Sequence, residues 1–347
     1  MRAVTFQAPG EVRIEERPEP VLEHADEAII QVEASGVCGS DLHIYHGRVP
    51  VEPGTVIGHE YVGTVLAVGD GVTRVAPGDR VLGCFHVACG SCTACLRGDY
   101  HRCERGRTFG HGSTLGSLPG TQADQALVPF ADVVLRKVPE GMSAETALFA
   151  GDVMGTGYHA VAHAGMKAGD TVAVLGLGPV GLCAVQAALA GGATQVFAVD
   201  SVEQRLDLAA QFGATPIHLT EGDPKREVRA ATEGRGADVV VEAVGGTGPM
   251  DLALKLAGPV GRIVSVGTHA SPSWAFPLAH AFRSESTLSF AIGDAIRLRR
   301  RLVRLVSGGA LDPTVVIDAR GRLEDVPDLY RRLSAQECLK AVVSPRG

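Results

Sequence analysis

The sequence predicts an α/β protein with a β-rich domain and a doubly wound parallel sheet. Residues 1 to about 150 carry short Val-rich segments separated by Gly, Pro and Asp, which is the spacing of a compact β domain. From about 153 to 294, apolar segments of strand length alternate with segments of helical length. At 347 residues the chain is long enough for two cores. We expect domains at 1–152, completed by 295–347, and at 153–294.

The expected elements follow these patterns in chain order. In the first region we expect strands at 27–32, 62–68 and 79–82, and the amino-terminal residues alternate like a strand. In the second region a strand and a helix open the alternation, and further elements follow at 202–212, 238–244, 249–256, 262–266 and 287–292. Beyond 295 a charged helix precedes segments at 314–317, 326–333 and 340–343. This tail is too short to fold alone, so we expect it to return to the first domain.

The segment Thr171–Asp200 predicts a dinucleotide site. An apolar strand leads into the turn Gly176-Leu-Gly-Pro-Val-Gly181, and an Ala/Leu-rich helix and a second strand ending at Asp200 follow. The glycines permit a tight turn, close approach of a pyrophosphate and close packing of the helix on the sheet. A glycine turn used for packing alone is disfavoured, because strand, helix, second strand and acid occur in order. Asp200 can accept hydrogen bonds from a ribose diol and would repel a 2′-phosphate, so we expect NAD rather than NADP. The predicted contacts are Gly176, Gly178, Pro179, Val180, Gly181 and Asp200.

Composition excludes several classes of function. Hydrophobic residues make up 45% and charged residues 20% of the chain, as in ordinary globular proteins. The net charge of -7 argues against nucleic acid as a partner, and no apolar segment has the length to span a bilayer. The first residues do not resemble a signal peptide, so eight cysteines suggest metal binding or catalysis in a reducing cytoplasm. One basic cluster, expected to be a solvated helix face, comprises Arg297, Arg299, Arg300, Arg301 and Arg304.

A cluster of four cysteines predicts a metal site on one loop. Cys89, Cys92, Cys95 and Cys103 have the spacing C-x2-C-x2-C-x7-C in a Gly-containing segment. Four thiolates can complete the tetrahedral shell of a structural zinc ion. An iron–sulfur cluster is the alternative, but the bacterial ferredoxin pattern ends with a three-residue gap and Cys-Pro. We therefore expect zinc.

A second, dispersed set of residues carries a family resemblance. Cys38 lies in GVCGSDLH, and His59 and Glu60 lie in GHEYVGTVLAVGDGV at 58–72. The latter is similar to the signature of zinc-containing alcohol dehydrogenases of the medium-chain dehydrogenase/reductase superfamily. The resemblance covers the whole chain, because these motifs, the cysteine loop and GLGPVG occur in the family's order. It implies a GroES-like β-rich catalytic domain and a Rossmann domain.

The resemblance also implies a catalytic zinc ion in addition to the structural one. Cys38, His59 and Asp152 match the three protein ligands. Glu60 is either a fourth ligand that exchanges with water or substrate, or a neighbour of the metal. Asp41 matches the carboxylate that orients the ligand histidine.

Further roles are implied at matching positions. Ser40 resembles the hydroxyl that accepts the alcohol proton, and His43 the histidine that passes it to solvent. The segment Val266, Gly267 and Thr268 resembles the backbone that holds the carboxamide. Arg205 is expected near the adenine and Lys340 near the pyrophosphate. Candidates for the substrate pocket are Phe85, Phe109, His111, Thr156 and Trp274.

The function implied is reversible hydride transfer between an alcohol, secondary or small primary, and NAD, with an aldehyde or ketone as the other substrate. Formaldehyde or another aldehyde, a diol and threonine are alternative substrates. A zinc-free quinone or enoyl reductase and a non-catalytic zinc and NAD sensor are weaker alternatives. We expect a homodimer or homotetramer, with the strand at 287–292 as a candidate joining edge.

Overall fold

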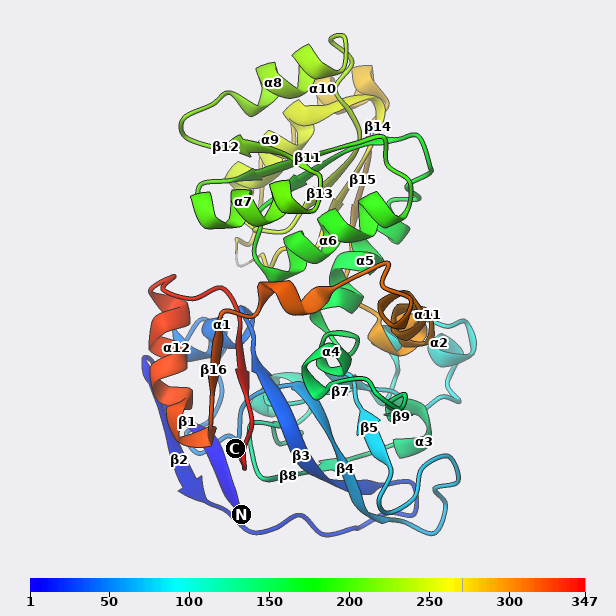
Figure 1. The fold of residues 1–347 in the computed structure, drawn as a ribbon, viewed down its shortest axis with the longest axis vertical. Helices are drawn as coiled ribbons and strands as arrows, with labels where there is room; N and C mark the ends of the chain where they lie inside the picture. The colour runs from blue at the N-terminus through cyan, green and yellow to red at the C-terminus, as the bar shows by residue number, and fades with distance from the viewer. Residues whose placement is uncertain (270, 347) are drawn as a thin grey trace. The chain divides into compact units, whose positions relative to one another are not determined.

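The computed structural model describes residues 1–269 and 271–346, which form two compact units (Figure 1). The first unit comprises Met1–Asp152, Asp294–Ser307 and the segment from Pro313 to the end of the described chain. The second comprises Val153–Gly293 and Gly308–Asp312. Compared with the expected boundaries, Asp294 lies in the first unit and residues 308–312 lie in the second.

A parallel sheet forms the centre of the second unit. Within the described residues it has six strands in the order β12-β11-β10-β13-β14-β15. Their bounds are β10 Thr171–Leu175, β11 Gln195–Asp200, β12 Thr215–His218, β13 Ala237–Glu242, β14 Ala257–Ser265 and β15 Thr287–Phe290. The order reverses between β10 and β13, which is the switch point where doubly wound sheets bind ligands. The helices are α5 Val153–His163, α6 Pro179–Ala190, α7 Glu203–Gln211, α8 Pro224–Ala231, α9 Thr247–Leu256 and α10 Leu278–Ser284.

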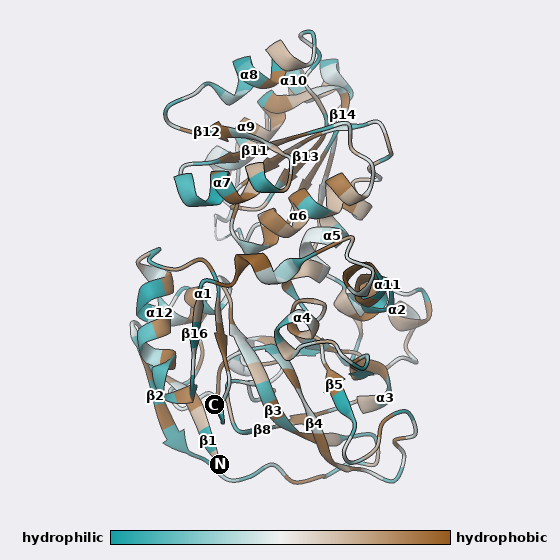
Figure 2. Ribbon diagram, in the orientation of Figure 1, coloured by the Kyte–Doolittle hydropathy of each residue, from teal (hydrophilic) through white to brown (hydrophobic). Residues whose placement is uncertain are grey.

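Burial on both faces explains the apolar character of this sheet. Strands β10, β11 and β13 are buried along almost their whole length, and Figure 2 shows them in mostly hydrophobic colours. The strand expected at 238–244 ends at Glu242, and the one expected at 262–266 begins earlier, at Ala257. The elements α5, β12, α8 and α10 were not predicted from the sequence. β12 has only four residues, half of them exposed, and half of the residues of α8 are charged.

A mostly antiparallel sheet organises the first unit, with β16 and β17 as its parallel pair. Its order is β16-β17-β3-β4-β5-β9, with β8 also paired to β3, and two small ribbons, β1-β2 and β6-β7, accompany it. The larger strands are β1 Arg2–Ala8, β2 Glu11–Glu16, β3 Ala28–Val37 and β4 Glu60–Val68. The shorter ones are β5 Arg80–Leu82, β6 His86–Val87, β7 Arg107–Thr108, β8 Gln125–Val128, β9 Arg136–Lys137, β16 Ala319–Gly321 and β17 Ala341–Val343. Strand β17 pairs with β3, so the carboxyl-terminal tail completes this unit.

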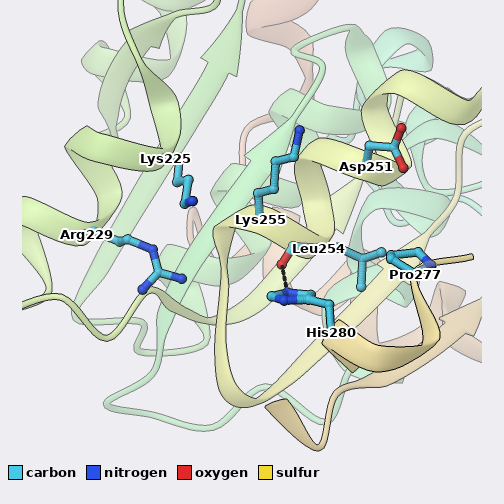
Figure 3. Close-up of a pocket in the computed structure, with 7 residues that line it drawn as sticks. All are labelled: Lys225, Arg229, Asp251, Leu254, Lys255, Pro277 and His280. Carbon is cyan, nitrogen blue, oxygen red and sulfur yellow. Dashed lines mark hydrogen bonds between the residues drawn. The ribbon is translucent and has the colours of Figure 1, made fainter. Parts of the chain in front are cut away.

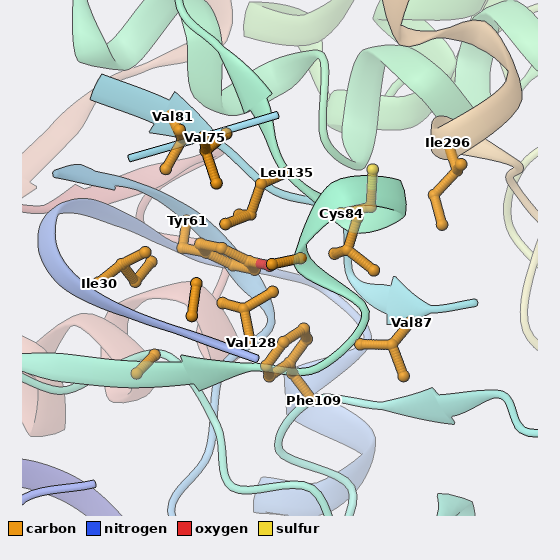
Figure 4. Close-up of a cluster of buried hydrophobic side chains, with 14 of the residues drawn as sticks. Ile30, Tyr61, Val75, Val81, Cys84, Val87, Phe109, Val128, Leu135 and Ile296 are labelled. Atoms are coloured by element: carbon orange, nitrogen blue, oxygen red, sulfur yellow. The ribbon is translucent and has the colours of Figure 1, made fainter. Parts of the chain in front are cut away.

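Helices of the first unit are short apart from two near the carboxyl end. They are α1 Asp41–Tyr45, α2 Thr93–Leu96, α3 Ala131–Val134, α4 Ala144–Phe149, α11 Ala295–Ser307 and α12 Val326–Ser334. The segment expected at 314–317 is a 3-10 helix, Pro313–Val316. A buried cluster around Tyr61 and Phe109, whose ring centroids are 5.1 Å apart, fills the core beside β4 (Figure 4). Phe109 is completely buried there, which excludes it as a substrate-pocket residue.

The basic cluster on α11 is only partly a solvated face. Arg297, Arg300, Arg301 and Arg304 are exposed, but Arg299 is 8% exposed. The Arg299 guanidinium donates hydrogen bonds to the carbonyl oxygens of Val133 and Val134 at the end of α3. Because the last carbonyls of a helix have no partner within the helix, this arginine acts as a cap from a distant segment.

We predict that Arg299→Met destabilises the first unit by about 1–3 kcal/mol for each carbonyl left without a donor. The measurement is the midpoint of thermal or urea unfolding. Arg300→Met, one position along the same helix and exposed, is the matched control and should change stability by no more than about 0.5 kcal/mol. Equal effects of the two substitutions would show that the Arg299 hydrogen bonds contribute nothing.

Candidate active site

The pairing of β3 with β4 brings the dispersed motifs together. Gly36 of β3 lies opposite Glu60 of β4 in the antiparallel register. Cys38 follows the end of β3 and His59 precedes β4, so both lie at the same edge of the sheet. Asp152 reaches this edge from the end of α4, a helix that packs on both strands. Four residues from three segments therefore converge.

The converging side chains form a compact donor set. Single ligand atoms of Cys38, His59, Glu60 and Asp152 all lie within 4.8 Å of one another. His59 Nε2 is 3.2 Å from Asp152 Oδ2, and Cys38 Sγ is 3.8 Å from the same oxygen. A thiol, an imidazole and carboxylates are the ligands that zinc takes in proteins, so these residues fit a zinc ion.

Asp41 fixes the orientation of the histidine ring. His59 Nδ1 lies 2.9 Å from Asp41 Oδ1, and the Cys38 N–H donates to the other carboxylate oxygen at 2.9 Å. This contact places the proton on Nδ1 and leaves Nε2 directed at Asp152. Burial opposes ionisation of Asp41, but His59 and the Cys38 N–H lower its pKa overall. One buried carboxylate thus positions two of the predicted ligands.

Glu60 forms a buried ion pair with Lys340. Lys340 Nζ lies 2.5 Å from Glu60 Oε1 and donates to the Val37 carbonyl at 3.2 Å, and both side chains are almost inaccessible to solvent. Burial alone would lower the pKa of Lys340, yet Glu60, Cys38 and Asp152 raise it above its usual value. Glu60 Oε2 has no hydrogen-bond partner among the described residues, which leaves one oxygen available beside the donor set. The structure corrects the expectation that Lys340 contacts a pyrophosphate.

Gly36 makes room for this ion pair. A Cβ atom at Gly36 would lie 2.2 Å from Glu60 Oε2 and 3.1 Å from Lys340 Nζ. A side chain at this position would therefore collide with the charged pair. No sequence motif marks Gly36 as part of the site. Its place opposite Glu60 in the β3–β4 register reveals that it leaves space for the ion pair.

One residue of the expected proton path lies beside the donor set. The Ser40 hydroxyl is 3.2 Å from His59 Nε2. His43 is half-buried on α1, and burial, Arg48 and His46 lower its pKa. A neutral imidazole near pH 7 can accept a proton, as this role requires.

Two of the pocket candidates line the site. Phe85 and His111 have ring centroids 6.5 and 5.5 Å from that of His59. His111 Nδ1 donates to the Phe109 carbonyl at 2.8 Å, which leaves Nε2 as an acceptor. Trp274 and Thr156 belong to the second unit, where the Trp274 indole donates to Asp251 on α9. Cys183 and Cys338 are buried core residues.

The four-cysteine loop forms a second donor set. One sulfur atom from each of Cys89, Cys92, Cys95 and Cys103 lies within 4.8 Å of the other three. The backbone N–H groups of Cys89 and Arg105 donate to Cys103 Sγ at 3.2 and 3.3 Å. Burial opposes ionisation of Cys89, but hydrogen bonds from Ser91, Arg105 and Cys92 lower its pKa to about 5. Backbone hydrogen bonds also lower the pKa of Cys92, whereas burial raises those of Cys95 and Cys103. Four sulfur atoms gathered in this way fit a tetrahedral zinc ion.

The glycine turn of the second unit leaves space for a dinucleotide. Gly176 has a φ of 83°, and a Cβ at Gly181 would lie 1.8 Å from the Gly176 carbonyl. Nothing lies within 4 Å of a Cβ placed at Gly178, so the backbone there is open to a ligand. Pro179 and Val180 begin α6. The turn thus has the close packing and the exposed helix start that a pyrophosphate needs.

Asp200 ends β11 beside this turn. Its Oδ2 accepts from the Leu177 N–H at 2.6 Å, and Oδ1 accepts from the N–H groups of Ser201 and Val202. The Arg205 guanidinium lies 3.6 Å from the same carboxylate. Val266, Gly267 and Thr268 follow β14, and the Val266 N–H bonds to the Glu242 carbonyl at the end of β13. All the expected cofactor contacts of this unit therefore lie at the carboxyl ends of parallel strands.

Comparisons with known proteins identify the family. Residues 24–140 match the alcohol dehydrogenase GroES-like domain, and residues 179–307 match the zinc-binding dehydrogenase domain. A protein of Mycobacterium tuberculosis described as a probable zinc-binding alcohol dehydrogenase is 40% identical over 90% of this chain and 80% of its own. The chain belongs to the zinc-type alcohol dehydrogenases of the medium-chain dehydrogenase/reductase family. This confirms the family resemblance and makes the protein an oxidoreductase.

Solved structures agree with this assignment. An alcohol dehydrogenase from Thermus sp. ATN1 superposes with a TM-score of 0.96 at 42% identity, covering 99% of both chains. A zinc-binding dehydrogenase of Sinorhizobium meliloti bound to NADP has a TM-score of 0.88 at 29% identity, again covering 99% of both. The predicted fold class, a GroES-like domain joined to a Rossmann sheet, is confirmed. Within the described residues, no helix is long and apolar enough to cross a membrane.

We predict that Lys340→Met destabilises the first unit by about 3–5 kcal/mol, because it leaves the Glu60 carboxylate buried without a partner. Unfolding by urea measures the change. The control is the double variant Lys340→Met/Glu60→Gln, which removes both charges and should recover much of the loss. If the effects of the two substitutions on the free energy of unfolding are simply additive, loss of the ion pair is not the cause of the destabilisation.

Proposed function

We propose that the protein is a zinc-dependent alcohol dehydrogenase that transfers hydride reversibly between an alcohol and NAD. The observation that carries the proposal is the convergence of Cys38, His59 and Asp152 within 4.8 Å, beside the Ser40 hydroxyl. Three ligands leave one position for substrate, which is the arrangement of a catalytic rather than a structural zinc site. A zinc ion bound there would act as a Lewis acid on the substrate oxygen.

The residues of the chain supply orientation and proton transfer. Asp41 holds the His59 ring, and the Glu60–Lys340 pair keeps a carboxylate beside the site without adding a full uncompensated charge. In our proposal the Ser40 hydroxyl accepts the alcohol proton and His43 carries it towards solvent. The lowered pKa of His43 supports this role, because the ring is neutral near pH 7 and free to accept.

We also propose two zinc ions per chain, the second held by Cys89, Cys92, Cys95 and Cys103. This loop contains little apolar sequence, so the metal would provide much of its folding free energy. Thiols that bind a metal must stay reduced, so we propose a reducing compartment such as the cytoplasm.

We expect a small or medium apolar secondary alcohol as substrate. The rings of Phe85 and His111 lie beside the ring of His59, and neither residue carries a fixed charge. A small primary alcohol, formaldehyde or another aldehyde, a diol and threonine are the other candidates, and a substrate panel separates them.

We propose that the protein is a homo-oligomer, at least a dimer. Strand β15 is an edge of the parallel sheet. The side chain of Phe290 on this strand is 58% exposed, and that of Phe282 on α10 is 85% exposed. Large apolar side chains at an open sheet edge favour pairing with a second copy. Sedimentation of the purified protein as a monomer at micromolar concentration would refute this.

We predict that Asp152→Ala abolishes turnover, because the substitution removes a metal ligand. Dinucleotide binding should stay intact, because the dinucleotide site lies in the other unit. NADH formation is measured across primary, secondary, diol, polyol and β-hydroxy amino acid substrates, and zinc content by elemental analysis. The metal should fall from two ions to one per chain. Cys103→Ser is the contrasting variant, since it should remove the other ion. Full activity of Asp152→Ala would rule out its role as a ligand, and zinc and NAD binding without turnover of any substrate would favour a sensor.

We predict a preference for NAD over NADP that depends on the charge of Asp200. Asp200→Asn keeps the side-chain acceptor but removes the negative charge that would face a 2′-phosphate. Discrimination against NADP, measured as the ratio of kcat/KM values, should weaken by at least about tenfold. Comparable kcat/KM with both cofactors in the unaltered protein would show that Asp200 does not select between them.

A further inference from the structure

A cavity of about 270 Å³ lies between α8, α9 and α10 of the second unit (Figure 3). Lys225 and Arg229 of α8 line one side, Leu254 and Lys255 of α9 line another, and Pro277 and His280 complete it. We call it the α8–α9–α10 cavity. Its volume is close to the lower limit of small-molecule sites, roughly 300 Å³. It therefore suits a small metabolite rather than a dinucleotide.

The cavity is separate from the predicted dinucleotide site. Arg229 lies in the last turns of α8, shortly before β13 begins at Ala237, and Lys255 lies at the end of α9, just before β14 begins at Ala257. These positions face the amino ends of the parallel strands. The Gly176 turn and Asp200 lie at the carboxyl ends. A ligand in the cavity would not occupy the dinucleotide site.

The charges around the cavity are not balanced. Lys225, Arg229 and Lys255 are cationic, and among the described residues no ion pair joins any of them to a carboxylate. The one acid of the lining, Asp251, accepts a hydrogen bond from the Trp274 indole at 2.9 Å. The chain as a whole carries a net charge of -7, so this gathering of cations is a local feature. Unneutralised like charges repel one another, and a bound anion would relieve that repulsion.

The arginine is held in place yet keeps donors unused. Arg229 donates from one terminal nitrogen to the Gly234 carbonyl at 2.8 Å, which fixes the guanidinium. Figure 3 shows Lys225 and Arg229 extending from α8 towards α9. A guanidinium and ammonium groups that line one cavity are groups of the kind that bind phosphate in proteins.

The remaining lining is suited to an apolar substituent. Leu254 is almost completely buried, and Pro277 also lines the cavity, so part of the cavity wall is apolar. His280 Nε2 donates to the Leu254 carbonyl at 3.3 Å, so this ring nitrogen already has a partner. We propose that the α8–α9–α10 cavity binds a small organic phosphate, with the phosphate beside Lys225, Arg229 and Lys255 and the organic part against Leu254 and Pro277.

Titration calorimetry of the zinc-replete protein with phenyl phosphate tests this proposal, alone and with the dinucleotide site saturated by NAD. Binding should persist with NAD and weaken as salt is raised. The double variant Lys225→Gln/Lys255→Gln should bind at least about tenfold more weakly, which corresponds to the loss of charge-assisted contacts. Both lysines are exposed, so the fold should tolerate the change.

Arg226→Gln is the matched control, because Arg226 lies on the same helix, is exposed and does not line the cavity. It should bind phenyl phosphate like the unaltered protein. Inorganic phosphate should bind more weakly than phenyl phosphate if the apolar lining contributes. Displacement of phenyl phosphate by NAD, equal weakening by Arg226→Gln, or no binding at millimolar concentration would each overturn the proposal. None of these outcomes depends on whether the protein oxidises alcohols.

Discussion

The antiparallel pairing of β3 with β4 is the constraint on which the rest of the site depends. It places Gly36 opposite Glu60, and so sets Cys38 and His59 at one edge. Strand β17 then pairs with the other side of β3, with Ala341 opposite Val37, which delivers Lys340 to the Glu60 carboxylate. Residues separated by 280 positions meet because β3 pairs with both β4 and β17. A shift of one residue in either register would turn these side chains to the opposite face.

Charge explains why the lysine belongs there. A cysteine, two aspartates and Glu60 surround His59 in a region almost closed to solvent, and buried carboxylates are costly without compensation. Lys340 neutralises Glu60, while Asp41 accepts a hydrogen bond from the Cys38 N–H and lies 2.9 Å from His59 Nδ1. Asp152 lies against His59 Nε2 and Cys38 Sγ, within the donor set that would hold the proposed divalent cation. Each buried acid of the site therefore has a cationic, ring or backbone group of the protein beside it.

Much of this was predictable from the sequence, and the exceptions have physical reasons. The parallel sheet followed from long apolar segments in alternation, and the four-cysteine set from its spacing. The set Cys38, His59 and Asp152 followed from the family resemblance. Local patterns could not reveal β12, because half of its residues are exposed. They could not reveal the burial of Arg299 either, because its hydrogen-bond partners lie 165 and 166 residues away. The ion pair of Lys340 escaped for the same reason. Side chains whose surroundings come from distant segments carry no signal in their own neighbourhood.

The cysteine loop shows how such long-range contacts also connect motifs that are easily identified. Asp294 accepts hydrogen bonds from the Tyr100 N–H and the His101 ring, both in the loop, and from the Arg297 N–H at the start of α11. Asp294 is also the residue at which the chain returns to the first unit. The Asp294 carboxylate is fully buried, so water does not replace the donors of the loop, and losing them would leave its oxygen atoms without hydrogen bonds. Order in the four-cysteine loop and the position of α11 are therefore coupled through one aspartate, 194 residues from Tyr100 in sequence.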